Sequence, residues 1–500
     1  MDDGLVLAFD LGTSGVKAVL VDFKGRVVDH ASESYGLIMP HPGWAEQVPE
    51  DYWVACCRAS RAVCAAGSGE RVRAVVFATQ WKGMIPLDPE GKVLHNSLIW
   101  MDARTGEEAA ELARSYGKPI THLHYWPRVM WFRKHFPELF SKTRAILEAN
   151  SFLKYRCCGV MATDVSNNFI HSPLPETDEF FRGALEAAGL DRDLFPPLCM
   201  PSDCLGPVTP QAAKELGITT EAKVFGGLCD IPAVAIGSGA ISPGDCHMYL
   251  GTSGWVAVTE SVKDCPPPLM PSLMSAERWV CHGDLRACCF AFVWGIRTFY
   301  AGEKSRLGEN IYAFVEKEMD AVPAGSDGLA CIPTLDGVTK MFGTSMNASF
   351  VNIRPDHGRA HMLNSLLEGI CMIYRSRKEN LEQRFNRKLE AINAVGGGAL
   401  SRHWMQIMAD SLGCEIRVPE GTRFAGALGA ACAALIGLGV YRDEDECKKA
   451  ISGLHADVFI PDPEKKAVYD ALYERMRRLY GFKAAGQSAQ SGSSASAPAN

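Results

Sequence analysis

The sequence predicts an α/β protein built from two large, related domains, and three observations support this fold class. The chain has 500 residues, which is more than one hydrophobic core usually organises, and 47% of them are hydrophobic. The pentapeptide Leu-Gly-Thr-Ser-Gly occurs at 11–15 and again at 250–254, each time between two apolar stretches. Segments with the pattern of strands alternate with segments with the pattern of helices in both halves. We place the domain boundary near residue 226, which gives domains at 1–226 and 227–483.

The first half opens with a predicted hairpin. Residues 5–10 form a short apolar strand, residues 12–15 have the composition of a turn, and residues 16–22 form a second strand. The further elements expected in this half are a strand at 74–79 and helices around 104–115 and 138–148.

The second half repeats this alternation after the second copy of the pentapeptide. The glycine-punctuated run 227–240 is typical of a junction between domains. The uncharged stretch 424–441 is dominated by Ala and Gly, so we interpret it as a buried helix rather than a membrane span. The segment 484–500 has no charged residue and is expected to be a disordered tail. The regular elements expected are a strand at 255–258, a helix at 360–384, a strand at 391–395 and a helix from about residue 401.

Composition and charge argue against several classes of function. The net charge is -7 and the pI is near 6.0, with acids and bases interspersed, which gives no electrostatic footprint for nucleic acid or anionic membranes. The 18 cysteines never show the Cys-x-x-Cys spacing of zinc or redox sites. The first residues resemble no signal peptide. We therefore expect a cytoplasmic protein with reduced thiols.

The duplicated turn indicates phosphate binding. A glycine- and hydroxyl-rich turn after a buried strand presents several backbone N–H groups to one concavity, where phosphate oxygens bind. Asp10, at the end of the strand before the first copy, is suited to hold Mg²⁺. One such hairpin is more often an ordinary surface turn, but two copies favour phosphate. A Walker-type P-loop string is absent from the sequence.

Two further positions complete the predicted chemistry. Gly396-Gly397-Gly398-Ala399 follows a strand and precedes a helix, which permits close approach of a nucleotide to the backbone. Phosphoryl transfer to a hydroxyl also needs a base, and the candidate is Asp230, which lies in a glycine-rich, otherwise apolar segment. Taken alone, an Asp before Ile-Pro is more often a turn residue or a helix cap.

These residues together resemble a known family, the FGGY carbohydrate kinases, and especially its xylulokinase-like branch. The resemblance extends from about residue 4 to residue 480 and consists of many motifs in the family's order. The motifs lie at 10–17, 41–47, 100–104, 127–131, 163–166, 227–239, 367–369, 396–399 and 409–410.

The resemblance implies two actin-like, ribonuclease-H-like ATPase domains with a catalytic cleft between them, the first binding mainly sugar and the second mainly ATP. The implied function is ATP- and Mg²⁺-dependent phosphorylation of a small ketose or polyol, a xylulose-like sugar first. Similar kinases are commonly homodimers. By motif position Asp10 would serve the metal and Asp230 would be the base and contact the sugar. The residues implied for ATP and its phosphates are Gly12, Thr13, Ser14, Lys17, Gly251, Thr252, Gly398 and Ala399.

The sequence departs from the family pattern at positions expected to line the sugar pocket. Gln80-Trp81-Lys82-Gly83 stands where xylulokinases usually carry Gln-Met-His-Gly, and Ile-Pro follows Asp230. Trp81 either stacks on a sugar face or belongs to the core. Lys82 either donates to a hydroxyl or an anionic group of the substrate or lies in solvent. Residues 335–340 also replace the family's usual loop, and the sequence does not say with what effect.

Two other functions share the duplicated turns. The first is an actin-like ATPase acting as a chaperone or filament subunit, and the second is an inactive relative that binds sugar or nucleotide without transfer. A chaperone or filament has no need of Asp230 or of the Gln80 region, and an inactive relative has no need to keep Asp10, both turns and Asp230. The kinase is therefore the preferred hypothesis.

Overall fold

The computed structural model describes residues 4–167, 170–172, 174–264, 277–285, 288–335, 340–342, 344–452 and 456–491. The chain forms two compact units. The first comprises Met1–Pro243, Thr259–Val280 and Phe424–Leu454, and the second comprises Gly244–Val258, Cys281–Arg423 and His455–Asn500. The predicted boundary near residue 226 lies within the first unit, to which the chain also returns at Phe424.

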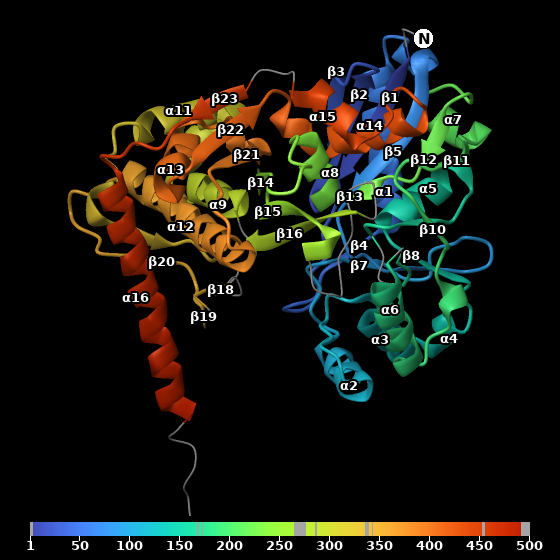
Figure 1. The fold of residues 1–500 in the computed structure, drawn as a ribbon, viewed down its shortest axis with the longest axis horizontal. Helices are drawn as coiled ribbons and strands as arrows, with labels where there is room; N and C mark the ends of the chain where they lie inside the picture. The colour runs from blue at the N-terminus through green and yellow to red at the C-terminus, as the bar shows by residue number, and fades with distance from the viewer. Residues whose placement is uncertain are drawn as a thin grey trace, which may run out of the picture. The chain divides into compact units, whose positions relative to one another are not determined.

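A seven-stranded mixed sheet forms the centre of the first unit (Figure 1). Six strands follow the order β11-β12-β5-β1-β2-β3, and β13 also pairs with β5. The strand β1 is antiparallel to β2 and parallel to β5, which confirms the predicted hairpin and the strand at 74–79. Both central strands are almost wholly buried, as expected for parallel strands covered on two faces. The strands are β1 (Leu5–Leu11), β2 (Gly15–Asp22), β3 (Val27–Ser34), β5 (Val72–Thr79), β11 (Cys204–Pro207), β12 (Lys223–Phe225) and β13 (Leu228–Cys229).

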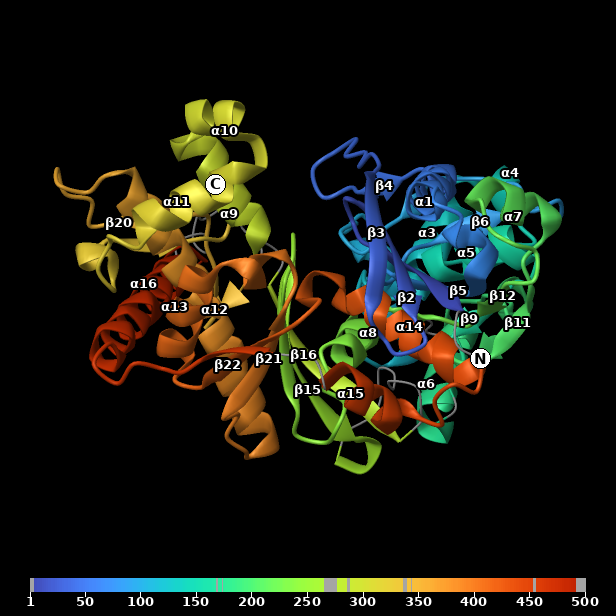
Figure 2. The same cartoon turned by 90° about the horizontal axis from the view of Figure 1, so that it is seen from above.

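Helices α8 and α14 lie side by side against this sheet (Figure 2). Their backbones touch at two glycines: a Cβ added to Gly237 would lie 1.8 Å from the carbonyl oxygen of Ala425, and one added to Gly429 would lie 1.8 Å from that of Ala233. This close packing confirms that the uncharged stretch at 424–441 contains a buried helix. The helices of this unit are α1 (Pro49–Cys64), α2 (Gly106–Tyr116), α3 (Tyr125–His135), α4 (Pro137–Phe140), α5 (Ala149–Cys158), α6 (Pro175–Ala187), α7 (Pro210–Leu216), α8 (Asp230–Gly237), α14 (Ala425–Gly437) and α15 (Glu444–Ser452).

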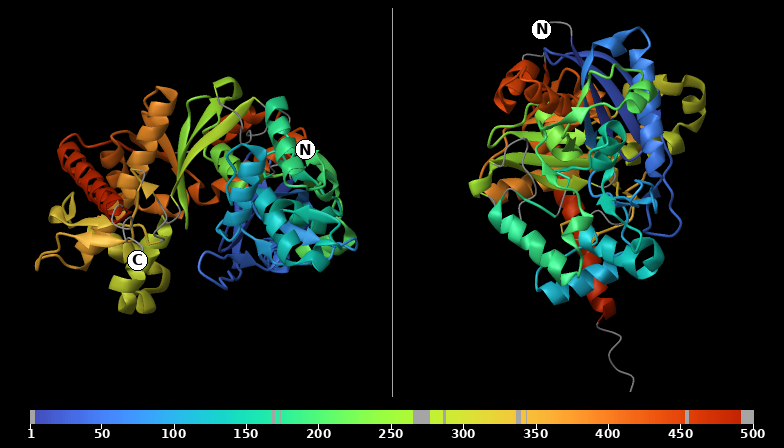
Figure 3. Two further views of the ribbon diagram at one scale, coloured as in Figure 1. Left: turned by 90° about the horizontal axis from the view of Figure 1, so that it is seen from below. Right: turned by 90° about the vertical axis from the view of Figure 1, so that its right-hand side faces the viewer.

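The predicted helix at 138–148 is wrong. Helix α4 ends at Phe140, and Ala145–Leu147 form the strand β8, which pairs with β6 (Ile85–Leu87). All three residues of β8 are buried in succession, as in a short core strand, whereas an amphipathic helix would expose part of such a run. Helices α2, α3 and α6 pack together below the sheet in the right-hand view of Figure 3. The remaining short pairs are β4 (Glu46–Gln47) with β7 (Ser97–Leu98) and β9 (Thr163–Asp164) with β10 (Leu198–Cys199).

The second unit is built on a six-stranded sheet of order β16-β15-β14-β21-β22-β23. Here β14 is antiparallel to β15 and parallel to β21, so the hairpin and its parallel neighbour repeat the arrangement of β2, β1 and β5. The predicted strands at 255–258 and 391–395 are confirmed, and with them the α/β class. The strands are β14 (Cys246–Leu250), β15 (Gly254–Ser261), β16 (Arg278–Leu285), β21 (Ala391–Val395), β22 (Glu415–Pro419) and β23 (Ala456–Phe459), with the short pairs β17 (Ala330–Ile332) and β20 (Ser349–Val351), and β18 (Lys340–Met341) and β19 (Thr344–Ser345).

The helices of the second unit include both that the sequence predicts. Helix α12 covers the segment predicted at 360–384, and α13 begins after Ser401, whose hydroxyl accepts a hydrogen bond from the Trp404 N–H at 3.2 Å. Helix α16 covers the first part of the segment predicted to be disordered, and residues 492–500 lie outside the described residues. Within the described ranges, the helices are too short or too polar to cross a membrane. They are α9 (Cys289–Phe299), α10 (Ala301–Leu307), α11 (Ile311–Met319), α12 (Arg359–Phe385), α13 (Arg402–Leu412) and α16 (Lys466–Ser491).

Candidate active site

The chemically important residues predicted in the first unit follow three parallel strands. Asp10 lies near the end of β1, Gln80 follows β5, and Asp230 follows β13. On β5, Ala78 pairs with Asp10 on one side and with Leu228 on the other. Because parallel strands end at the same edge of a sheet, the three residues lie at that edge, where α/β proteins bind ligands.

The first turn is held by side chains from elsewhere in its unit. The Gly12 N–H donates to the Gly15 carbonyl at 2.9 Å and closes the turn. The Gln47 amide donates to the Thr13 carbonyl at 2.7 Å, and the Trp100 indole N–H donates to the Thr13 hydroxyl at 3.0 Å. These bonds keep a glycine-rich turn in one conformation, as a preformed phosphate site requires.

Asp10 and Lys17 form an ion pair across the base of this hairpin. They are directly opposite in the β1–β2 register, with 3.1 Å between the Lys17 Nζ and the Asp10 Oδ2. The Asp10 side chain is 12% exposed, so its carboxylate is accessible while most of its surface is covered. Part of the cover is Gly426, where an added Cβ would lie 2.8 Å from the Asp10 Cγ. Ser14, at the tip of the turn, is exposed.

The carboxylate of Asp10 is compatible with the Mg²⁺ that a phosphate site implies. Among the described residues, no three His, Cys, Asp or Glu side chains are grouped so that they could hold a metal ion by themselves. Mg²⁺ usually takes one or two protein carboxylates and completes its shell with water and substrate phosphates. A single carboxylate beside a phosphate-binding turn is a suitable donor set for that mode.

Gln80 belongs to a buried polar network under the first turn. Its side chain is 2% exposed, and its amide donates to the Gln47 Oε1 at 2.6 Å. The Tyr52 hydroxyl donates to the same Gln47 oxygen at 2.8 Å. Because the Gln47 amide donates to the Thr13 carbonyl, Gln80 supports the first turn through Gln47. The sequence predicts that Gln80 contacts the sugar, and that role stays a prediction.

Trp81 and Lys82 lie beside each other with an unusual backbone. Lys82 has a φ of 64°, in the left-handed region that non-glycine residues seldom adopt. Its ammonium lies 3.6 Å from the centroid of the Trp81 ring. Trp81 is partly buried against the aromatic core of this unit. Burial, and after it the positive charge of Lys82, lower the pKa of nearby His124 to about 4.

Asp230 occupies the first turn of α8. The residue is partly buried, and its Oδ1 accepts a hydrogen bond from the Ile231 N–H at 3.0 Å. An anionic side chain at this position is favoured by the helix dipole. The N-cap position of α8 is Cys229, so Asp230 is the first residue of the helix rather than its cap, and its role as the base stays a prediction.

The second turn has a different register from the first. In the first copy Leu11 pairs with Val16, and the four residues 12–15 separate them. In the second copy Leu250 pairs with Gly254, and only the three residues 251–253 separate them. The beginning of α9 contacts this turn, since the backbone N–H groups of residues 289 and 288 donate to the carbonyls of Gly251 and Thr252 at 2.9 and 3.1 Å.

The glycine cluster after β21 packs directly on the second turn. Gly396 has a φ of 101°, and an added Cβ would lie 2.6 Å from the Leu250 carbonyl oxygen. A Cβ on Gly398 would lie 2.8 Å from the Leu250 Cβ. Gly251, Thr252, Gly398 and Ala399 are therefore gathered at the carboxyl ends of the parallel strands β14 and β21. Ala399 is only 3% exposed, so a nucleotide would meet the backbone here rather than this side chain.

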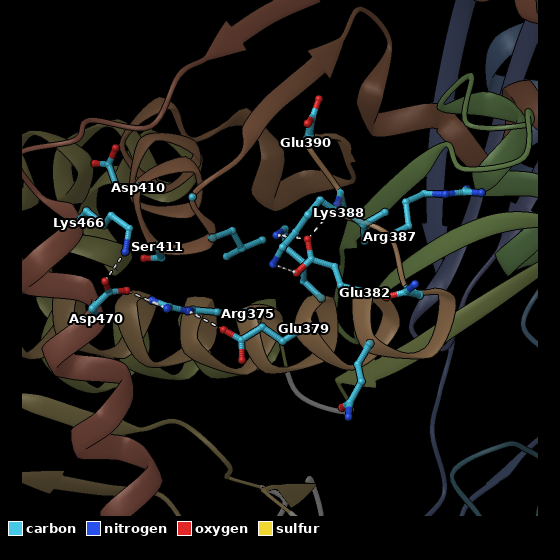
Figure 4. Close-up of a pocket in the computed structure, with 16 residues that line it drawn as sticks. Arg375, Glu379, Glu382, Arg387, Lys388, Glu390, Asp410, Ser411, Lys466 and Asp470 are labelled. Carbon is cyan, nitrogen blue, oxygen red and sulfur yellow. Dashed lines mark hydrogen bonds and ion pairs between the residues drawn. The ribbon is translucent and has the colours of Figure 1, made fainter.

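A separate pocket of about 720 Å³ lies in the second unit between α12, α13 and α16 (Figure 4). Its charged side chains bind one another: Lys378 lies 2.8 Å from Glu382, and Arg375 lies 2.8 Å from Asp470. None of the predicted site residues lines it. This pocket is therefore distinct from the candidate site.

Sequence reasoning did not single out three residues that shape the site. Gln47 and Trp100 lie inside motifs that mark the family resemblance, at 41–47 and 100–104, but motif membership alone does not say that both bind Thr13. Gly426 lies 416 positions after Asp10, and its only signal is the run of small residues in α14. The loop 335–340, noted as a departure, includes residues 336–339, which lie outside the described residues.

Family models match most of the chain. Residues 5–237 match the N-terminal domain, and residues 246–438 the C-terminal domain, of the FGGY family of carbohydrate kinases.

Two relatives and a solved structure match this chain over nearly its whole length. The xylulose kinase of Bacillus subtilis is 27% identical over 95% of this chain and 96% of its own. The L-xylulose/3-keto-L-gulonate kinase of Escherichia coli is 26% identical, again over 95% of this chain and 96% of its own. The crystal structure of xylulose kinase from Rhodospirillum rubrum superposes with a TM-score of 0.76 at 26% identity, covering 96% of this chain and 98% of that one.

Proposed function

Because this chain belongs to the FGGY family of carbohydrate kinases, and is thus a phosphotransferase with an alcohol group as acceptor, we propose that it phosphorylates a small ketose or polyol, with Asp230 as the base. The kinases of this family take the phosphoryl group from ATP. One observation carries the proposal: Asp10, Gln80 and Asp230 lie at the carboxyl ends of neighbouring parallel strands, and thus at one edge of the first sheet.

The proposed roles follow from what each group can do. Asp230 accepts the proton of the attacking hydroxyl, since its partly buried carboxylate follows β13 directly and is a suitable proton acceptor. The first turn and Lys17 bind the terminal phosphates through backbone N–H groups and an ammonium. Gly251, Thr252, Gly398 and Ala399 bind the rest of the nucleotide through the backbone at the ends of β14 and β21.

Asp10 would hold Mg²⁺, which supplies charge neutralisation on the transferring phosphates. Lys17 lies 3.1 Å from the Asp10 carboxylate, and this ion pair holds the carboxylate near the turn.

The acceptor is proposed to be a xylulose-like sugar, in keeping with the names of the relatives. Lys82 adds a second possibility within the same class, a sugar that carries a carboxylate, because its ammonium lies on the Trp81 ring next to the end of β5. The E. coli relative acts, by its name, on both kinds of acceptor. The substrate panel below separates the two.

Free thiols support a reducing compartment for this enzyme. All the cysteines in the described ranges are free, and most of them are buried. Disulfides are rare in the cytoplasm, so we propose that the protein acts there.

A coupled ADP-release assay tests the function. Wild-type protein with ATP and Mg²⁺ is screened against ketopentoses, ketohexoses, tetritols, pentitols and sugar acids. We expect strong stimulation by one ketose, polyol or sugar acid. ATP hydrolysis that no acceptor stimulates would instead favour a chaperone-type or filament-type ATPase, and absence of all turnover an inactive relative.

Asp230→Asn then tests the base. This near-isosteric change removes the proton acceptor and keeps the volume, so we expect kcat to fall about 10²- to 10⁴-fold while KM for ATP changes less than about threefold. Turnover close to wild type would remove Asp230 from this role without affecting the assignment as a kinase.

A further inference from the structure

The segment 226–229, which leads directly into Asp230, is held by a buried hydroxyl. The Cys229 N–H donates to the Ser166 Oγ at 2.7 Å. Ser166 donates its own hydroxyl proton to Asp164, whose Oδ1 also accepts from the Ser166 N–H at 2.8 Å. Since the hydroxyl proton is committed to the carboxylate, a lone pair of the oxygen is left for Cys229. Ser166 and Asp164 are both 0% exposed.

Two side chains of α5 hold carbonyl groups of the same segment. The Asn150 amide donates to the Leu228 carbonyl at 3.1 Å and to the Phe77 carbonyl of β5 at 2.8 Å. The Lys154 ammonium donates to the Gly226 carbonyl at 2.8 Å. Asn150 and Lys154 are also fully buried. Three side chains thus bind three backbone groups within four consecutive residues.

The first two residues of this segment, Gly226 and Gly227, have no side chains that could fix them by packing. Gly227 has a φ of 71°, and an added Cβ would lie 2.3 Å from the Phe77 carbonyl oxygen. A Cβ on Gly226 would lie 2.1 Å from the Met200 carbonyl oxygen. Glycine is required at both positions, and glycine leaves the backbone more freedom than any other residue. Hydrogen bonds to the backbone therefore take the place of side-chain packing here.

We propose that Ser166, Asn150 and Lys154 are positioning residues for Asp230. They fix the main chain just before it, so that its carboxylate stays within hydrogen-bond reach of the substrate hydroxyl. A base must lie about 2.6–3.2 Å from its proton donor, and a misplacement of about 1 Å can cost about 10²-fold in rate. This inference rests on the proposed role of Asp230 as the base.

A purely structural role predicts lower stability without a specific loss of turnover, and Ser151 offers a matched control. Ser151 is also 0% exposed, and its hydroxyl likewise binds one carboxylate, that of Glu148, and one backbone group, the Ala162 carbonyl at 2.7 Å. It lies in the same buried polar cluster but makes no hydrogen bond to residues 226–229. Both Ser→Ala changes remove one buried hydroxyl that binds a carboxylate and one backbone group, which is an N–H for Ser166 and a carbonyl for Ser151.

The experiment compares Ser166→Ala with Ser151→Ala in the full-length enzyme, using ATP and the best acceptor from the panel. We expect similar decreases in Tm. For Ser166→Ala we expect kcat to fall about tenfold or more, with both KM values changed less than about threefold, and for Ser151→Ala we expect kcat within about twofold of wild type.

A double-mutant cycle with Asp230→Asn separates the two proposals. If Ser166 acts through Asp230, adding Ser166→Ala to Asp230→Asn lowers the residual turnover no further. Equal kcat losses in both backgrounds, or an unchanged kcat in Ser166→Ala, would overturn the positioning role and leave the base assignment intact. Full turnover of Asp230→Asn would overturn the base assignment itself. Should Ser166→Ala fail to fold, Asn150→Ala takes its place in the same cycle.

Discussion

The same five residues, Leu-Gly-Thr-Ser-Gly, form two different hairpins in the two units. The first has a four-residue connection, with the ion pair of Asp10 and Lys17 at its base. The second has a three-residue connection, and in place of the ion pair it has the stacked rings of Tyr249 and Trp255, with 4.3 Å between their centroids. The string therefore specifies a turn, while the residues on each side decide its register and its charge.

From this difference we predict that the two turns bind different parts of the nucleotide. Of the two described turns, only the first carries a carboxylate and an ammonium next to it, so we predict that the metal and the transferring phosphate bind there. The second offers backbone and aromatic surface, which suits groups that are bound but not transferred.

Removing the carboxylate from the first turn is expected to have the largest effect. Asp10→Asn should lower kcat by about 10²- to 10³-fold, because the charge that would hold Mg²⁺ is lost. At the corresponding position of the second hairpin, Tyr249→Phe keeps the stacked ring and should change kcat less than about threefold. Steady-state kinetics over a range of Mg²⁺ concentrations measure both. Comparable losses of kcat in the two variants would contradict separate roles for the two turns.

The two units also differ in how each compensates a buried glutamate, and stability as a function of pH measures this. Burial raises the pKa of Glu368 to about 7, although Gly325 and Ser326 donate hydrogen bonds to it. Since this is above its unfolded value, the folded state binds more protons, and stability falls as pH rises from about 4.5 to 7, by about 3 kcal/mol at most. In Glu368→Gln this loss should disappear, so that the Tm of the variant gains on wild type between pH 5 and pH 8.

The corresponding group of the first unit is expected to behave differently. Burial also raises the pKa of Glu148 to about 7, but Lys154 lies close enough to oppose the shift. Both Glu148 oxygens accept hydrogen bonds from backbone N–H groups, those of Asn150 and Ser151, and a Gln can accept with one oxygen only. Glu148→Gln should therefore be less stable than wild type at pH 5, and by the same linkage this deficit should become smaller toward pH 8. A variant as stable as wild type at pH 5 would show that the two glutamates are equivalent.

The smallest effect is expected from substituting the glycines that contact Asp10 and Leu250, the residues next to the two turns. A Cβ on Gly426 would displace the Asp10 carboxylate, so Gly426→Ala should lower kcat about tenfold. A Cβ on Gly398 meets Leu250, before the second turn, and should mainly raise KM for ATP. Gly302→Ala, where an added Cβ meets no atom within 4 Å, is the control. Equal kcat losses for Gly426→Ala and Gly398→Ala would argue against separate roles.

Much of the fold could be predicted because its signals are local. The apolar strands of both hairpins, the strand before the glycine cluster and helix α12 each follow from periodicity within a short window. The prediction of a helix at 138–148 is wrong because the three-residue core strand β8 is too short to show a period. Its partner β6 lies about 60 positions earlier in the sequence.

The candidate site was predictable only in part, for a related reason. Asp10 and Lys17 are neighbours within one hairpin, so their pairing is local. The contacts of Gly426 with Asp10 and of Ser166 with Cys229 join segments that are distant in the sequence. No sequence pattern near these residues predicts the contacts. Hydrogen bonds from buried side chains to a distant backbone depend on the folded packing and leave no periodic signal in the sequence.

The glycine contacts between α8 and α14 have a mechanical consequence. Where two backbones touch, no side chain lies between them to change rotamer and absorb a displacement. Asp230 begins α8, and Gly426, which rests on Asp10, lies at the beginning of α14. A displacement of either helix is therefore transmitted to the other. Asp230 lies on α8, and Asp10, on β1, contacts α14 at Gly426, so the positions of the two carboxylates are coupled.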